Sequence, residues 1–578
     1  MKAKEPVPAA VEVQPAEAKV RAGKRVHFTA QVVDRHGRPL PGDVSWESAD
    51  CQVDATGTVV APAREGCYTV TARYQGLAGT AQLVVAAQGD RALAQPLMPL
   101  PAHGLAWQGQ LPAEKWVDFY TQVLAAYAHQ TTWDRLPPET VHETKRRILD
   151  SVGVAMAGFD EDAATAARAY AATLPDPGGA TLWGTANRSN AEAAGFANGV
   201  AVRCLDFNDT YLSKEPLHPS DSIPALVALA ERYRHGGREL IAAIATAYEV
   251  SVTLCDAASL RAHGWDHVNY VGIGVACGAG AMLGLSPERI EHAIAIAAIP
   301  HAAMRRTRAG ELSMWKGAAA ANAARNAVFA VQLARAGMTG PDRPFEGEMG
   351  FFEQLLGGET FDDDDVLWRL ETKAPPTRIL DTYVKYWPVE YHAQSAVDAA
   401  LQFPADVVGD PDQIASIEIE TFQTAYDIIV KDPEKWDPKT RETADHSLPY
   451  IVVAALLDGE VTRRTFDLER IRDPRTLDML KNRVSVREEL ELTAGYPEGI
   501  PNRITVRTVG GDKRVREVTH PRGHARNPMS DEEIVAKYRA NVEERWEPDR
   551  VAWVQHLVWD LDREANLREL TSALAVPA

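Results

Sequence analysis

One stretch in the first half of the chain carries side chains that could do acid–base chemistry. In residues 204–221, Asp206 and Thr210 are four positions apart, so a helical turn would place them on one face. His218 follows in a proline-flanked loop, and loops on a rigid scaffold often carry function. The alternative interpretation is a helix end whose polar side chains only cap the backbone.

A second candidate group follows at residues 264–270. His267 stands next to Asp266, directly before an apolar segment. Histidine titrates near neutral pH, so this pair could be a base with an orienting carboxylate. The pair could equally be a satisfied helix cap.

Five basic residues then gather around an alanine-rich segment. Arginine binds carboxylates with two parallel hydrogen bonds, so such a group could form an anion pocket. A solvated basic face is the alternative. The five are Arg305, Arg306, Arg308, Lys316 and Arg325.

Composition narrows the function classes. The chain has 578 residues, of which 45% are hydrophobic and 24% charged, an ordinary globular mixture. Its longest weakly polar run, 271–285, is too short to span a bilayer, so no membrane partner is expected. A formal charge of −19 argues against nucleic-acid binding by bulk electrostatics.

The cysteines and the N-terminal residues narrow the possible function classes further. None of the five cysteines forms a C-x-x-C motif, which argues against zinc ribbons and ordinary iron–sulfur clusters. No apolar core follows the first charged residues, so we expect a cytoplasmic protein, with export of a native precursor left open.

The hydrophobic pattern predicts several domains. Residues 8–87 are rich in Val and Thr with period-2 alternation, typical of an all-β sandwich, and the stretch 44–59 resembles bacterial immunoglobulin-like modules. Cys51 and Cys67 could pair there in an oxidising compartment or remain free thiols. The proline-containing segment 88–112 reads as a linker.

From residue 113 the period changes to that of helices. Residues 113–383 predict a large all-α domain, to which a final helical segment, 530–575, returns. Strand patterns reappear within 384–529, including a hairpin around Gly510-Gly511-Asp512, which predicts an inserted α+β domain.

The polar stretch 204–221, the segment 264–270 and the basic cluster over 305–325, in this order, resemble the MmgE/PrpD family. This family contains 2-methylcitrate dehydratases and cis-aconitate decarboxylases. Further matching stretches are 149–153 (Leu-Asp-Ser-Val-Gly), 387–397 (Trp-Pro-Val-Glu-Tyr-His-Ala-Gln-Ser-Ala-Val) and 446–454 (His-Ser-Leu-Pro-Tyr-Ile-Val-Val-Ala). The resemblance runs from about 113 to 570. It implies a helical domain with a smaller α+β lid, usually as a homodimer. It also implies a lyase without a cofactor that acts on small di- or tricarboxylates.

The resemblance also implies site residues. The family's active-site Asp and Thr fall on Asp206 and Thr210, its loop histidine on His218, a second histidine on or near His267, and its tyrosine on Tyr450. A lysine of the decarboxylase branch falls on Arg325, and the lid histidine has no clear match around Glu390, His392 and Gln394. These departures favour the dehydratase branch.

Removing a proton beside a carboxylate requires cations to stabilise the enediolate, a base and an acid. We assign substrate binding to Arg308, Lys316, Arg325 and His392, and the base to His218 or His267. The acid would be Tyr450 or the other histidine. Asp206 would orient a histidine, and Thr210 would hydrogen-bond the substrate.

The predicted function is therefore dehydration of 2-methylcitrate or a related hydroxy-acid, without a cofactor or metal. Decarboxylation or epimerisation of a related polycarboxylate is the first alternative. A non-catalytic scaffold, with the β module binding a partner, is the second.

Overall fold

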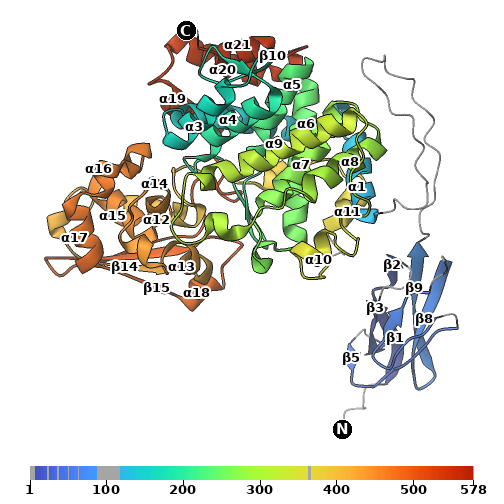
Figure 1. The fold of residues 1–578 in the computed structure, drawn as a ribbon. Coiled ribbons are helices and arrows are strands. Elements are labelled where there is room, and N and C mark those ends of the chain that lie inside the picture. The colour runs from blue at the N-terminus through green and yellow to red at the C-terminus, as the bar shows by residue number, and fades with distance from the viewer. Residues whose placement is uncertain are drawn as a thin grey trace. The chain divides into compact units, whose positions relative to one another are not determined.

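The computed structural model describes residues 7–21, 25–35, 38–49, 51–62, 64, 66–86, 118–361 and 366–576. The chain divides into two compact units, Met1–His103 and Gly104–Ala578, each described here by itself (Figure 1). The predicted linker, 88–112, lies outside the described residues.

The first unit is built from short strands. One sheet has the order β1 (Pro8–Gln14), β4 (Thr29–Asp34), β5 (Pro39–Leu40). Another has the order β2 (Glu17–Arg21), β9 (Leu77–Ala86), β8 (Gly66–Tyr74), β6 (Ser45–Glu47), and β3 (Arg25–His27) pairs with β7 (Thr58–Val60). Their inward side chains share one core that includes Val11, Phe28, Val70 and Leu83. The predicted strand-rich N-terminal region is confirmed, and the immunoglobulin-like assignment stays a prediction.

The two cysteines of this unit are free thiols. The thiol of Cys51 donates to Ser48 Oγ at 3.0 Å, and that of Cys67 donates to Gln82 Oε1 at 3.0 Å. The structure therefore contains no Cys51–Cys67 disulfide.

The second unit is dominated by helices that share one hydrophobic core. They are α1 (Phe119–Gln130), α2 (Pro138–Ala157), α3 (Asp162–Ala172), α4 (Ala191–Arg203), α5 (Ile223–Tyr233), α6 (Gly237–Ala257), α7 (Val268–Met282), α8 (Pro287–Ala298), α9 (Trp315–Arg335), α10 (Phe351–Leu355), α11 (Val366–Glu371), α19 (Asp531–Val542), α20 (Pro548–Trp559) and α21 (Arg568–Leu574). Of the C-terminal helices, α19 packs on α2, where Lys537 Nζ lies 2.7 Å from Asp150 Oδ1.

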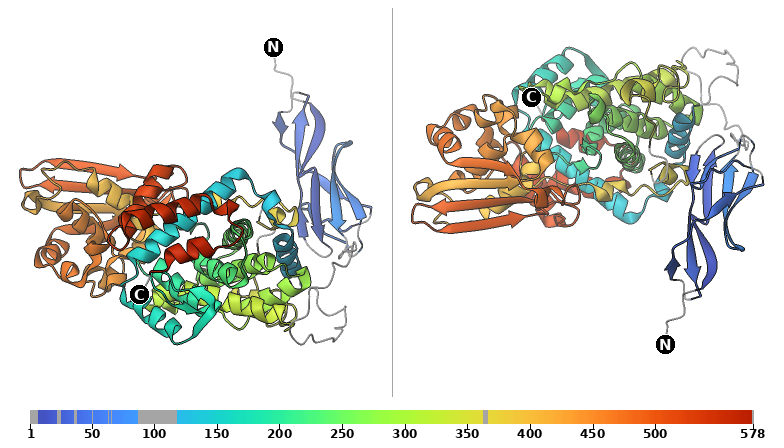
Figure 2. Two further views of the ribbon diagram at one scale, coloured as in Figure 1. Left: turned by 90° about the horizontal axis from the view of Figure 1, so that it is seen from above. Right: turned by 90° about the horizontal axis from the view of Figure 1, so that it is seen from below.

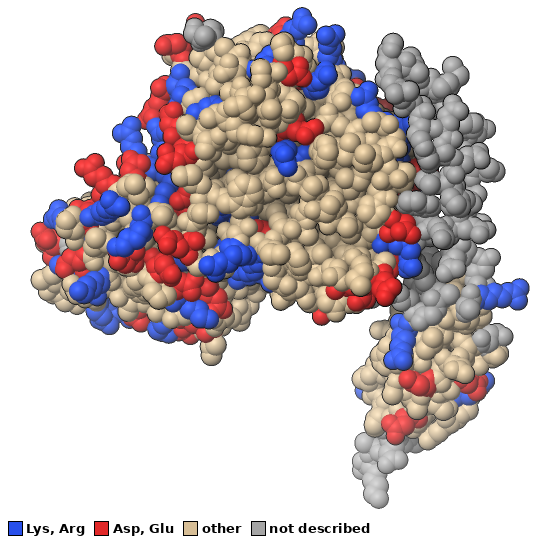
Figure 3. Space-filling model, in the orientation of Figure 1, with Lys and Arg blue, Asp and Glu red and all other residues tan. Residues whose placement is uncertain are grey.

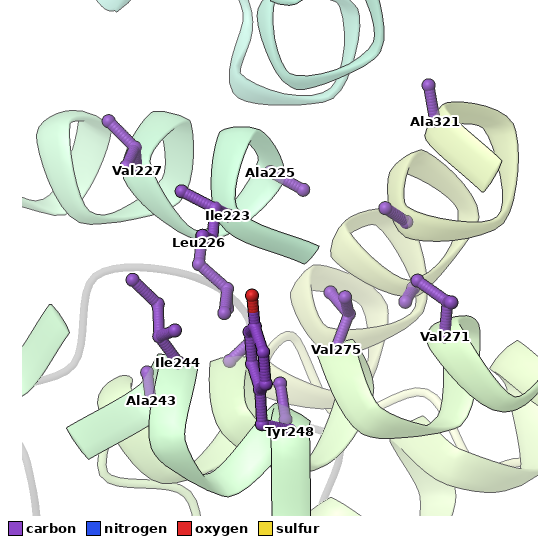
Figure 4. Packing of buried hydrophobic residues seen from close by; sticks show 14 of the residues in the cluster. Ile223, Ala225, Leu226, Val227, Ala243, Ile244, Tyr248, Val271, Val275 and Ala321 are labelled. Carbon is purple, nitrogen blue, oxygen red and sulfur yellow. The ribbon is translucent and has the colours of Figure 1, made fainter. Parts of the chain in front are cut away.

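Small residues let the central helices approach closely. A Cβ on Gly278 of α7 would lie only 2.3 Å from the carbonyl oxygen of Ala243 of α6. Figure 4 shows the result, with Tyr248 of α6 standing between Leu226 of α5 and Val275 of α7. The helix α6 is long and apolar enough to cross a membrane by length and composition, but 94% of its apolar window is buried inside the protein.

The region 384–529, called the α+β part here, contains a four-stranded sheet and most of a second hydrophobic core. Its sheet has the order β15 (Val484–Glu488), β14 (Ile414–Thr421), β16 (Asn502–Thr508), β17 (Lys513–Val518), with only β14 and β15 parallel. The strands β16 and β17 pair antiparallel, as the glycine-containing turn predicts. Helices α12 (Gln394–Leu401) and α15 (Leu448–Asp458) pack on the sheet (Figure 2). Shorter helices complete this part: α13 (Gln423–Ile429), α14 (Arg441–Ala444), α16 (Leu468–Ile471), α17 (Pro474–Asn482) and α18 (Leu490–Thr493).

The expectation of a purely helical segment over 113–383 is wrong in detail. Two short antiparallel pairs interrupt the helices, β10 (Pro175–Thr181) with β11 (Arg188–Ser189) and β12 (Tyr211–Leu212) with β13 (Pro216–Leu217). Pairs this short, with Pro and Gly in them, carry no readable period-2 signal. The second pair matters for function because His218 follows it directly.

Candidate functional site

A cavity of about 430 Å³ opens between the helical part and the α+β part of the second unit. It is lined by basic residues, histidines and acidic residues. The charged and histidine residues from the helical part are Arg203, Asp206, Glu215, His218, Arg261, His267, Arg305, Arg308 and Lys316, and those from the α+β part are Glu390, Asp427, Asp432, Glu434, Lys435 and His446.

Asp206 lies at the centre of the buried charges. It follows the end of α4 with φ of 51°, a left-handed conformation that Asp adopts more readily than most residues. It is therefore not on a helical turn with Thr210, contrary to the prediction. Its carboxylate is paired with Arg203 and lies 3.1 Å from Lys385 Nζ and 3.6 Å from Lys316 Nζ.

These cations keep Asp206 ionised. Burial by itself raises its pKa, but Arg203, Lys316 and Lys385 outweigh burial and hold the pKa well below the ordinary value. In return, Asp206 partly neutralises three cations that would otherwise repel one another beneath the cavity.

His218 is held in one orientation by the backbone. Its Nδ1 lies 2.8 Å from the carbonyl oxygen of Asp209, which can only accept, so Nδ1 carries the hydrogen. Burial, together with Arg203 and Lys385, lowers the pKa of His218 well below its ordinary value. The neutral ring therefore has its lone pair on Nε2.

A buried network fixes the loop that carries His218. The Asp209 carboxylate accepts from the backbone N–H of Ser220 at 2.9 Å and from the hydroxyl of Tyr248 at 2.6 Å. Thr210 Oγ1 donates to the carbonyl of Leu217 at 3.0 Å and so pins the β12–β13 pair. The loop is thus tied to the core helix α6.

His267 lies beside His218, with 5.5 Å between the ring centroids. Its Nδ1 is 3.3 Å from Oδ1 of Asp266, whose two oxygens accept from Arg308 Nε at 2.9 and 3.0 Å. Burial, assisted by Arg308, lowers the pKa of His267 to about 3. His267 is thus a neutral ring at neutral pH.

Lys316 reaches the cavity because α9 approaches α4 very closely. A Cβ on Gly199 of α4 would lie 2.8 Å from Cβ of Ala321, and one on Gly317 would lie 3.0 Å from Cα of Cys204. Lys316, in the first turn of α9, is 1% exposed. Among the residues that the structure describes, its Nζ has no hydrogen-bond partner.

The structure brings together five of the nine predicted site residues: Asp206, His218, His267, Arg308 and Lys316. The other four do not line the cavity. Thr210 binds the backbone as above, and Tyr450 is buried with its hydroxyl donating to the carbonyl of Thr465. Arg325 lies on α9 and donates to Asn326 Oδ1 at 2.7 Å. His392 is buried, and its Nδ1 lies 2.7 Å from Oε1 of Glu390.

Sequence reasoning missed other polar residues of the site, namely Arg203, Lys385, Glu390, Lys435, Asp445 and His446. His446 is the most informative of these, because it lines the cavity with its Nδ1 2.5 Å from Oδ1 of Asp445. The adjacent Asp445-His446 pair has the same form as the Asp266-His267 pair, a candidate from its sequence pattern. Lys385 gave no comparable signal, because an isolated lysine says nothing about burial.

No cluster of three or more His, Cys, Asp or Glu side chains within the described ranges has a metal-binding arrangement. The hydrogen-bond donors that line the cavity are arginines, lysines and histidines, although Asp and Glu side chains line it as well. The arginine and lysine donors suit a carboxylate of a ligand.

Comparison with known proteins gives two family-model matches, to the "MmgE/PrpD N-terminal domain" over residues 122–364 and to the "MmgE/PrpD C-terminal domain" over 387–561. Together they cover more than half of the chain.

Named relatives align over similar lengths. A 2-methylcitrate dehydratase of Cupriavidus necator is 28% identical over 466 residues, covering 74% of this chain and 91% of that protein. The 2-methylcitrate dehydratase of Escherichia coli K12 is 28% identical over 389 residues, covering 63% and 78%. A human cis-aconitate decarboxylase is 27% identical over 482 residues, covering 79% and 95%.

Proposed function

The chain belongs to the MmgE/PrpD family, and from this premise we propose that it is a hydro-lyase that dehydrates 2-methylcitrate or a related hydroxy-polycarboxylate. The names of its relatives support lyase chemistry on small polycarboxylates. The cavity supports an anionic substrate.

One observation carries the proposal. Nζ of Lys316 and Nη2 of Arg308 are buried, and neither has a hydrogen-bond partner within the described part of the chain. Both residues line the cavity that also holds His218 and His267. Both cations have a carboxylate nearby, but a buried donor nitrogen without a hydrogen bond is costly, and a substrate carboxylate would satisfy both nitrogens.

In the proposed reaction, Nε2 of His218 takes the proton from the carbon beside a substrate carboxylate. The electron pair delocalises into that carboxylate as an enediolate, and Lys316 and Arg308 stabilise the charge as it forms. The pair then forms the carbon–carbon double bond as the hydroxyl leaves. His267, whose Nε2 is also buried without a partner in the described structure, would hydrogen-bond the substrate.

The α+β part has a role in this proposal as a lid. It supplies Glu390, Lys435, His446 and the segments 427–428 and 432–434 to a cavity whose remaining residues come from the helical part. Movement of one part against the other would admit substrate and then exclude water.

We propose that the protein acts as a homodimer through the outer face of α9. Trp315 and Phe329 are 50% and 42% exposed and lie about four helical turns apart on one face. Exposed Met304, Met314 and Met338 lie on the flanking segments, and Figure 3 shows few charged side chains over α7 and α9. Sedimentation equilibrium of the wild type and of Phe329→Glu tests this, since only the wild type should dimerise.

Turnover of separate polycarboxylates tests the function. The purified protein would be mixed with 2-methylcitrate, citrate or cis-aconitate, with alkene absorbance and NMR of the products as readouts. Alkene formed from 2-methylcitrate supports the dehydratase. Release of carbon dioxide from cis-aconitate instead would establish the decarboxylase chemistry of the human relative, and no turnover would remove the named substrates.

A further inference from the structure

His446 is a third histidine that lines the cavity, beside His218 and His267. It lies directly before α15, on the α+β part, whereas His218 and His267 belong to the helical part. Its side chain is 12% exposed and lines the cavity. Its Nε2 lies 3.5 Å from Oδ2 of Asp206, which places it among the charges at the base of the cavity.

Of the two ring nitrogens of His446, only Nδ1 makes a hydrogen bond within the described structure. Nδ1 lies 2.5 Å from Oδ1 of Asp445, a fully buried carboxyl group whose Oδ2 has no partner among the described residues. An Nδ1–H donated to Asp445 fixes the ring orientation and stabilises the imidazolium. Nε2 makes no hydrogen bond in the described structure; its charged neighbour is Asp206 Oδ2 at 3.5 Å, and a ligand in the cavity could take its hydrogen bond.

Tyr450, the predicted alternative, lacks these features. It lies one helical turn farther along, in α15, and its hydroxyl is committed to the Thr465 carbonyl. Tyr450 does not line the cavity. The two residues stand four positions apart in the matching stretch 446–454, and of the two only His446 lines the cavity.

We propose that His446, oriented by Asp445, is the catalytic acid that protonates the departing hydroxyl; this inference rests on the proposed dehydration. His218 Nε2 takes the proton from carbon, the C–H electron pair becomes the double bond, and the C–O bond breaks. His446 Nε2–H gives its proton to the hydroxyl, which leaves as water. His218 ends protonated and His446 neutral, and exchange with solvent restores both.

The charges around His446 connect its protonation to substrate binding. Burial and then Lys316 lower the pKa of His446 well below its ordinary value. The other charged groups that act on it are Asp206, Lys435, Glu390 and Asp445. A bound polycarboxylate would neutralise Lys316 and bring negative charge next to the ring, which favours the imidazolium. His446 would therefore be protonated, as the acid must be, when substrate is bound.

A change of leaving group tests the assignment. His446→Asn keeps an amide donor near Nδ1 for Asp445 but removes Nε2. Turnover of 2-methylcitrate would be compared with that of the analogue in which fluorine replaces the hydroxyl, because fluoride leaves without a proton. We expect His446→Asn to lower kcat on the hydroxy-acid by about 10²–10⁴-fold and on the fluoro-acid by less than about fivefold.

Matched variants separate the possible outcomes. His218→Asn should slow both substrates, and Tyr450→Phe should leave kcat on the hydroxy-acid within about threefold of wild type. If His446→Asn and His446→Gln, each folded by circular dichroism, keep kcat within threefold, or slow both substrates equally, His446 is not the acid. A wild-type protein that converts neither substrate would instead refute the proposed dehydration, and the role of His446 with it.

Discussion

Nζ of Lys316 lies 3.6 Å from Oδ2 of Asp206, and both side chains are 1% exposed. Lys316 lies at the start of α9, and Asp206 lies in the segment after α4. Asp206 also pairs with Arg203 and Lys385, so one carboxylate serves three cations. Of these cations, Arg203 and Lys316 line the cavity and could meet an anionic substrate.

Replacing Lys316 by Met should weaken substrate binding more than it harms the fold. The charge-assisted hydrogen bond to a substrate carboxylate is worth about 1.5–3 kcal/mol, so kcat/KM should fall by roughly 10–150-fold. Asp206 keeps two cationic partners, so the melting temperature should stay within a few degrees. Steady-state kinetics and a thermal melt check this, and a lower melting temperature with unchanged kcat/KM would show a structural role instead.

Replacing Asp206 by Asn should destabilise the protein strongly. The change leaves Arg203, Lys316 and Lys385 buried without their shared carboxylate, and breaking a buried ion pair costs about 3–5 kcal/mol. Urea unfolding measures the free energy of unfolding. Asp134→Asn on the surface is the control, and a second change, Lys385→Met, should restore part of the loss. Equal stability of Asp206→Asn and wild type would contradict the central role of this carboxylate.

His218→Asn should lower kcat by about 10²–10⁴-fold with little change in stability. The Asn amide can still donate to the Asp209 carbonyl, so the loop is retained while Nε2 is lost. Thr210→Ser keeps the hydroxyl that binds Leu217 and serves as the matched control, with near-normal kcat expected. If the two variants had similar kcat values, His218 would not be the base.

Asp221 makes stability depend on pH in a defined direction. Burial raises its pKa to about 7, although Arg203 opposes this shift. The folded protein then binds a proton between about pH 4 and pH 7 that the unfolded chain has lost, so this contribution to stability declines as pH rises through that window. Asp221→Asn should gain melting temperature relative to wild type between pH 5 and pH 8. A difference that is constant with pH would contradict the raised pKa.

Deleting residues 1–110 should leave kcat and KM unchanged. All residues lining the cavity belong to the second compact unit. The truncated and full-length chains can be compared on the same substrate at equal concentrations of active protein. A loss of activity in a truncated chain that still melts cooperatively would assign the strand-rich module a part in catalysis.

Much of the fold and part of the site could be predicted from the sequence. The change from period 2 to period 3.6 separated the strand-rich region from the helical part, because burial of one face leaves that period in the sequence. His218, His267, Arg308 and Lys316 could be singled out because they stand in short polar or basic clusters within apolar surroundings.

Only the tertiary structure decided which side chains share the cavity. Thr210 and Tyr450 stand in matching motifs, yet their hydroxyls bind backbone carbonyls, whereas His446 and Lys385, from the α+β part, meet Asp206. Sequence periodicity reports which face of an element is buried, but not which element lies opposite. That is set by close helix contacts such as Gly199 with Ala321, between residues far apart in the chain.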